Sequence, residues 1–163
     1  MSRLGVLYAL NEDELNKLRS IPQEERYNYM LDEIEELLLK TARGCELVKA
    51  WEGIQYCLGG GVWNEENSVP TNIVFGGEFL VETDDEIITL KNYSDVVQIV
   101  TYLRQNNLHE IIRKNFPLID EQEYTLPKND DNLNYLLDWS RDILSFYENA
   151  QKERCSVIFT VDL

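Results

Sequence analysis

"SVIFTVDL", residues 156–163, decides the fold class, because its side chains alternate as a half-buried β-strand requires. Two sets of side chains are expected on opposite faces of this strand: Val157, Phe159 and Val161 on one, and Ser156, Ile158 and Thr160 on the other. The chain also begins with a short apolar run, "LGVLYAL" (Leu4 to Leu10), which is typical of a buried strand. Since strands at both ends enclose mostly helical sequence, we expect the terminal strands to pair in one small sheet.

Capping residues and apolar spacing predict about five to six helices between these strands. Asn11, with Glu14 three residues later, forms a capping box for a helix through about Leu18. Further helices are expected from Pro22 to Gly44, Glu46 to Leu58, Ser94 to Leu103, Leu108 to Phe116 and Asp131 to Lys152. Short strands are expected at 73–75 and 86–90. The sequence therefore predicts an α+β fold, in which residues 1–163 form a single compact domain around a small mixed or antiparallel sheet.

The stretch "LVKAWEGIQYCLGGG", residues 47–61, is the part that most resembles a functional site. Its apolar residues follow the spacing of a core-facing helical stripe: Leu47, Trp51, Ile54 and Leu58. Gly59 is expected to end this helix in a left-handed conformation. Gly60 and Gly61 do not fit a phosphate-binding loop, which needs glycines that lead into a helix. The loop from Gly59 to Thr71 is long enough to form the rim of a pocket.

Charge is the clearest departure from average composition. The 163 residues include 30 acidic and 15 basic side chains, for a net charge of −15. Neutralising phosphates requires clustered Lys and Arg, so this balance argues against nucleic acid and anionic membranes as partners. A basic protein remains a suitable partner, and solubility alone would also account for the acidity.

Cysteine usage and hydropathy indicate a cytoplasmic protein. Cys45, Cys57 and Cys155 are an odd number without CxxC spacing, which is typical of buried free thiols in a reducing compartment. No apolar run reaches the length of a membrane span, and the first residues do not form a signal peptide. The oligomeric state stays open between a monomer and a weak dimer.

Little in the sequence favours catalysis. The single histidine, His109, is expected at the surface or at a helix cap, and no G-x-S-x-G nucleophile motif is present. One histidine and three scattered cysteines offer no zinc-ligand spacing, and the acidic "ETDDE" stretch lacks the calcium-loop register. We therefore expect neither a metal nor a cofactor, and the balance leans against an enzyme.

Two groups of residues are candidates for binding. A ligand cleft would be lined by side chains from the helix and from a following turn: Trp51, Glu52, Gln55 and Glu78. Burial of such carboxylates could raise their pKa values enough for general acid or base work. A basic partner would dock on the acidic face of the helix that begins near Pro22: Glu24, Glu25, Asp32, Glu33, Glu35 and Glu36. A solvated helix face is the alternative interpretation of these acids.

The chain resembles the YfbM-like family of bacterial proteins, a domain of unknown function. The matching segments run in order along nearly the whole chain: "GVLYALNEDELNKL", "LVKAWEGIQYCLGG", "NIVFGGEFL", "LRQNNLHEIIRKNFP" leading to "EYTLP", and "LLDWSRDILSFYENAQKERCSVIFTVD". The resemblance implies a compact α/β domain in the bacterial cytosol, and it implies no established activity.

The family's helix motif resembles KAW-x-x-[IL]-H-[FY]-x-LTG. It matches this chain at Lys49, Ala50, Trp51, Ile54, Tyr56, Leu58 and Gly60. The chain departs from it at Gln55, where the family often has histidine, and at Gly59, where it often has threonine. A glutamine cannot replace a histidine base, so the departure favours hydrogen-bonded binding over catalysis.

The leading hypothesis is a non-enzymatic acidic protein-binding module, comparable to an immunity protein, an inhibitor or an accessory domain. The alternative is a small-ligand-binding protein or enzyme that uses a carboxylate-lined cleft near Trp51, Glu52, Gln55 and Glu78.

Overall fold

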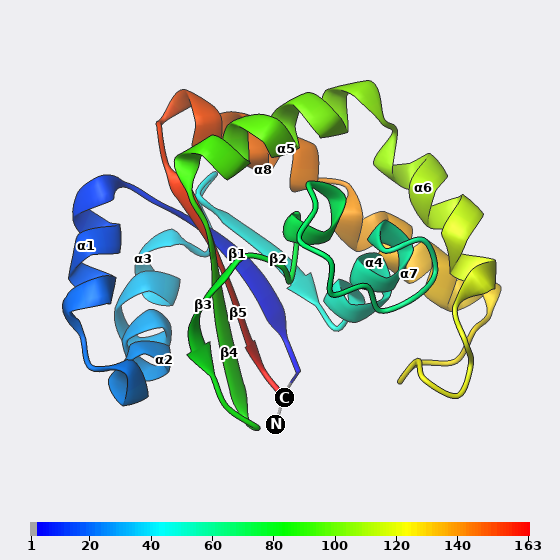
Figure 1. Ribbon diagram of the computed structural model, residues 1–163, viewed down its shortest axis with the longest axis horizontal. Helices are drawn as coiled ribbons and strands as arrows, with labels where there is room; N and C mark the ends of the chain where they lie inside the picture. The colour runs from blue at the N-terminus through cyan, green and yellow to red at the C-terminus, as the bar shows by residue number, and fades with distance from the viewer. Residues whose placement is uncertain (1–2) are drawn as a thin grey trace.

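The two terminal strands lie side by side at the centre of one sheet, as predicted. The computed structural model describes residues 3–163, and in that range it has one five-stranded antiparallel sheet with the order β2-β1-β5-β4-β3 (Figure 1). The strands are β1 (Gly5–Leu10), β2 (Gly44–Val48), β3 (Glu78–Glu82), β4 (Glu86–Lys91) and β5 (Ser156–Asp162). Leu7 of β1 is paired with Phe159 of β5, which confirms the predicted pairing.

Six helices of eight or more residues occur within residues 3–163, in agreement with the predicted number. They are α1 (Glu12–Ser20), α4 (Ala50–Leu58), α5 (Tyr93–Gln105), α6 (Leu108–Asn115), α7 (Asp130–Ser140) and α8 (Ile143–Lys152). The predicted capping box of α1 is present, since Glu14 N donates to Asn11 Oδ1 at 2.9 Å and Asn11 N donates to Glu14 Oε1 at 2.8 Å. The structure confirms an α+β fold.

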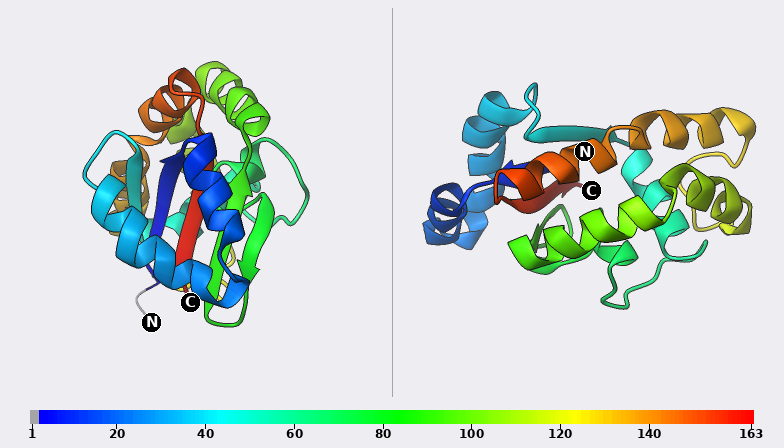
Figure 2. Two further views of the ribbon diagram at one scale, coloured as in Figure 1. Left: turned by 90° about the vertical axis from the view of Figure 1, so that its left-hand side faces the viewer. Right: turned by 90° about the horizontal axis from the view of Figure 1, so that it is seen from above.

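Helices cover both faces of the sheet. The helical segment 23–38 and α1 lie on one side, and α4 to α8 lie on the other (Figures 1 and 2). Each side has its own hydrophobic core: Ile158 packs with Met30 and Ile34, whereas Phe159 packs with Trp51. The expectation of a half-buried terminal strand is therefore wrong, because residues 157–161 are buried on both faces.

The helical segment 23–38 is wound less regularly than its sequence pattern predicts. It consists of the 3-10 helix η1 (Gln23–Glu25), α2 (Arg26–Tyr29), the π-helix η2 (Met30–Glu35) and α3 (Glu36–Leu38). Its buried residues Met30, Ile34 and Leu38 are four positions apart, a spacing that stays aligned when a turn holds more than 3.6 residues. Leu31 and Leu37 of the same segment are 41% and 61% exposed.

Residues 44–48 form a strand, although the sequence predicts a helix from about Glu46. Leu47 is buried in β2, which pairs with β1, and α4 begins only at Ala50. Val48, with a φ of 46°, separates the two elements. Every residue of α4 is buried, so this helix has no solvated face.

The backbone conformations of the three glycines after α4 differ from the prediction. Gly59 has a φ of −86°, and Gly60 and Gly61 take φ values of 84° and 96°. The left-handed residues therefore lie one and two positions beyond the expected one. Of the three glycines, only Gly60 and Gly61 adopt a positive φ, which the absence of a Cβ favours.

Three other boundaries differ from the prediction. Residues 73–75 form a turn after the 3-10 helix η3 (Pro70–Asn72), and β3 begins only at Glu78. The expected helix from Asp131 to Lys152 is divided into α7 and α8, which are joined by residues 141–142. Asn92, and not Ser94, caps α5, since Asp95 N donates to Asn92 Oδ1 at 2.9 Å.

Candidate functional site

A cleft of about 800 Å³ lies beside the edge strand β3, and we call it the β3 cleft. Its rim is formed by residues 63–67, and its other walls come from the turn 71–77, from β3 and from the first turn of α5. The predicted rim, the loop from Gly59 to Thr71, therefore does border a hollow. This cleft contains two of the four predicted ligand residues, Gln55 and Glu78.

The other two predicted ligand residues lie elsewhere. Trp51 and Glu52 line a separate hollow of about 220 Å³, together with Arg3 and Thr125. The structure does not place the carboxylates of Glu52 and Glu78 in one cleft, because one lies on α4 and the other at the exposed start of β3. General acid and base work by this pair has no geometric support. Ligand binding at each position stays a prediction.

Glu52 joins three distant parts of the chain. Although it is only 6% exposed, its Oε2 accepts from Arg3 Nη2 at 2.7 Å and from Thr125 Oγ1 at 3.0 Å. The indole Nε1 of Trp51 donates to the carbonyl oxygen of Arg3 at 2.9 Å. Because the Glu52 charge is matched by a guanidinium and a hydroxyl, this carboxylate contributes a buried anchor for residues 3 and 125.

The side-chain amide of Gln55 also has a structural role. Its Nε2 donates to the carbonyl oxygen of Thr71 at 3.0 Å, and its Oε1 accepts from Phe75 N at 3.0 Å. Both ends of a side chain that is 3% exposed are thus bound to the backbone of the turn. A ligand would have to displace these contacts to bind the amide of Gln55.

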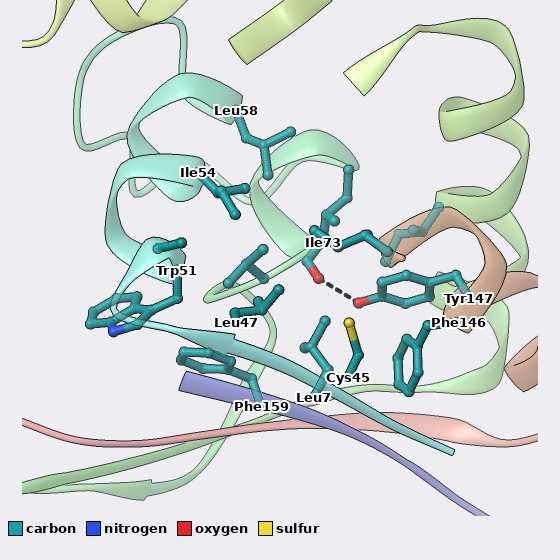
Figure 3. Packing of buried hydrophobic residues seen from close by; sticks show 14 of the residues in the cluster. Leu7, Cys45, Leu47, Trp51, Ile54, Leu58, Ile73, Phe146, Tyr147 and Phe159 are labelled. Carbon is teal, nitrogen blue, oxygen red and sulfur yellow. Dashed lines mark hydrogen bonds between the residues drawn. The ribbon is translucent and has the colours of Figure 1, made fainter. Parts of the chain in front are cut away.

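The same turn is held by two buried side chains that the sequence did not single out. Tyr147 of α8 donates its hydroxyl to the carbonyl oxygen of Ile73 (Figure 3), and Lys91 donates from Nζ to the carbonyl oxygen of Val74. Lys91 Nζ also donates to Thr89 Oγ1 at 2.8 Å and lies 5.4 Å from the ring centroid of Phe159. Three backbone groups of residues 73–75 are therefore bound by side chains: the carbonyl oxygens of Ile73 and Val74 and the N–H of Phe75.

Lys91 is completely buried. Burial lowers its pKa well below the ordinary lysine value, and the nearby negative charge of Asp95 acts in the opposite direction. The one sequence signal for this residue is its place at the end of the apolar strand "EIITL", where a lysine is normally expected to reach solvent. In the folded protein, α5 and the turn 73–75 cover the end of β4, so the side chain of Lys91 does not reach solvent.

Aromatic rings form one side of the β3 cleft. The ring centroids of Trp63 and Phe75 are 5.0 Å apart at an interplanar angle of 68°, and those of Phe75 and Phe79 are 6.0 Å apart at 72°. These edge-to-face contacts fix the three rings relative to one another. The sequence contains a signal for these rings, because two phenylalanines flank Gly76 and Gly77. The prediction of a strand at residues 73–75 concealed this signal.

The predicted docking face lies on the opposite side of the sheet from α4 (Figure 1). Five of its six acids are exposed: Glu24, Glu25, Asp32, Glu33 and Glu36. Glu35 is half-buried, and its pKa is raised by burial and, to a smaller extent, by the charge of Glu46. None of the six forms an ion pair with another residue in the range 3–163.

The three cysteines are free and buried, as predicted. Burial raises the pKa values of Cys45 and Cys57 to about 12. His109 lies half-buried in the first turn of α6. Across residues 3–163, no group of three or more His, Cys, Asp or Glu side chains is arranged to hold a metal ion. In the same range, no helix is both long enough and apolar enough to cross a membrane.

The chain belongs to a family of unknown function. Residues 1–160 match the domain of unknown function DUF1877. The fold is similar to the crystal structure of YfbM from Escherichia coli, itself described as a protein of unknown function. The TM-score is 0.63 at 15% sequence identity, with 97% of this chain and 99% of that chain covered. No curated protein matches this sequence.

Proposed function

We propose that this protein is a non-enzymatic acidic protein-binding module, of the immunity, inhibitor or accessory kind, whose partner is a basic protein. The observation that carries the proposal is the docking face, where five exposed carboxylates have no ion-pair partner within residues 3–163. An uncompensated acidic surface attracts positive charge over distances of about one Debye length, roughly 8–10 Å at ordinary salt.

The net charge of −15 supports the same proposal, because it raises the rate at which a basic protein meets this surface. The docking face also approaches the β3 cleft. Arg26 Nη1 donates to the carbonyl oxygen of Leu80 in β3 at 2.9 Å, which holds η1 against the edge of the sheet.

The test is a comparison of two variants with equal charge. One replaces the five exposed acids of the docking face with amides, and the other replaces five exposed acids elsewhere: Glu110, Glu121, Glu123, Asp138 and Glu153. Each protein is immobilised and exposed to lysate of the source organism at low and at high salt. We expect a basic protein to be retained at low salt by the wild type and by the control, and to be lost from the docking-face variant. Equal retention by both variants would contradict the proposal.

A second candidate is a small-ligand-binding protein that uses the β3 cleft. The cleft volume of about 800 Å³ lies in the ordinary range of ligand sites, and both Gln55 and Glu78 line it. Catalysis by paired carboxylates has no support, since Glu52 is anchored to Arg3 in another hollow. A ligand whose binding is weakened by substitutions in β3 would support this candidate.

A further inference from the structure

The β3 cleft combines aromatic rings with an excess of negative charge. Its lining includes five carboxylates and one guanidinium among the described residues: Glu65, Glu66, Glu78, Glu82, Asp95 and Arg19. Glu78 and Arg19 neutralise each other through an ion pair of 2.8 Å. The other four carboxylates have no ion-pair partner in the range 3–163.

The rings lie where an apolar stem could contact them. Trp63, Phe75 and Phe79 line the cleft in a continuous edge-to-face series. Phe79 is 44% exposed, so its ring can be reached by a ligand in the cleft. An aromatic face attracts cations and covers aliphatic chains at the same time.

We propose that the β3 cleft binds a cationic group carried on an aliphatic stem, an alkylammonium or an alkylguanidinium. The inference rests on the second candidate function and names its ligand class. The stem contacts the rings of Phe79 and Trp63, and the charged end is neutralised by the unpaired carboxylates. This chemistry is shared by free diamines and by the side chains of lysine and arginine.

Other ligand classes fit less well. An anion would meet an excess of carboxylates, and the guanidinium of Arg19 is already engaged by Glu78. A neutral polyhydroxy ligand needs free amide groups, and two amides of the lining are already engaged by the protein itself. Asn72 Nδ2 donates to Asn67 Oδ1 at 2.7 Å, and Gln55 is bound at both ends by the turn.

The first experiment compares 1,5-diaminopentane with 1,5-pentanediol, which has the same stem and no charge. Binding is measured by calorimetry and by the fluorescence of Trp63, against a Trp63→Phe variant that reports the remaining tryptophans. We expect saturable binding of the diamine, at least tenfold tighter than binding of the diol. Nα-acetyllysine amide, measured in parallel, distinguishes a free amine from a protein side chain as the better occupant. Whichever of these two amines binds more tightly, the result supports a site that binds cations.

The second experiment uses variants at exposed positions, where folding is preserved. Phe79→Leu keeps an apolar side chain and removes the aromatic face, and Glu82→Gln removes one charge. Each is expected to weaken diamine binding by about two- to fivefold. Glu121→Gln, at an exposed position outside the cleft, is the control, and it should leave the affinity unchanged.

The failures are distinguishable. Equal binding of diamine and diol would overturn the inference that the cleft binds cations, but it would not contradict the second candidate function, a small-ligand cleft. Diamine binding that is unchanged in both Phe79→Leu and Glu82→Gln would place the ligand outside the cleft and overturn the inference. Absence of saturable binding by all three probes would overturn it as well, without affecting the protein-partner proposal.

Discussion

Lys91 Nζ donates a hydrogen bond to the carbonyl oxygen of Val74, and this contact joins the end of β4 to the turn that lines the β3 cleft. The two residues are 17 positions apart, and the lysine is completely buried. Buried ionisable groups are concentrated at functional sites, although structural networks also contain them. The hydrogen bonds of Lys91 to Val74 and Thr89 give this lysine a structural role, because they hold the turn that lines the cleft.

Lys91 should make folding stability depend on pH in a particular direction. Its pKa is lowered in the folded state, so the unfolded state binds more protons between that lowered value and the ordinary 10.5. The free energy of unfolding therefore increases with pH in this window, with a slope of at most about 1.4 kcal/mol per pH unit. Lys91→Met removes this contribution.

The measurement is denaturant unfolding of the wild type and of Lys91→Met at several pH values between 7 and 10. We expect the wild type to gain stability relative to the variant as pH rises. Tyrosine ionisation is common to both proteins and cancels in the difference. A constant difference across this range would mean that the folded lysine keeps its proton.

Gln55→Leu should destabilise the protein, although leucine has a similar volume. The amide N–H of Phe75 would lose its partner, and the carbonyl of Thr71 would keep only the bond from Gly76 N at 3.0 Å. An unpaired backbone group at a buried site costs about 1–3 kcal/mol, so we expect a loss of about 1–3 kcal/mol. Gln98→Leu, on the exposed face of α5, is the control and should change stability by about 0.5 kcal/mol or less. Similar losses in the two variants would show that the bonds of Gln55 contribute little.

The cysteines should be unreactive in the folded protein. The pKa values of Cys45 and Cys57 are raised to about 12 by burial, so neither forms a thiolate at pH 8. We expect modification by a disulfide reagent to follow the rate of unfolding, and to become fast in denaturant. A Ser94→Cys variant supplies an exposed thiol for comparison. Rapid labelling of the folded wild type would contradict the burial of these thiols.

Local signals were sufficient to predict β1, β5 and the capping box of α1, because the partners of those residues lie in the same segment or obey simple alternation. Residues 44–48 were misassigned since pairing with β1 outweighs a helical apolar spacing. The turn 73–75 could not be predicted either. One of its carbonyls is bound by Tyr147, 74 positions away, and no local pattern announces such a contact.

The same limitation applies to the candidate site. Sequence reasoning found Gln55 and Glu78 at the cleft, but it paired Glu78 with Glu52. The partner of Glu52 is Arg3, which lies 49 positions away and is brought to α4 by β1. Charge alone therefore identified acidic residues without indicating which of them the fold would neutralise.

Gly77 should be the most sensitive glycine next to the cleft. Its φ of 130° is unfavourable for other residues, and a Cβ at this position would lie 2.4 Å from the carbonyl oxygen of Leu90. Because that oxygen belongs to the backbone of β4, Gly77→Ala must displace the start of β3. We expect a loss of about 2–4 kcal/mol, from the conformational cost and the steric clash together. The test is thermal unfolding alongside Gly60→Ala, since Gly60 also has a positive φ, 84°, but an added Cβ there meets no atom within 4 Å. Gly60→Ala should cost only about 1 kcal/mol, and equal losses in the two variants would mean that β3 yields to the added methyl group.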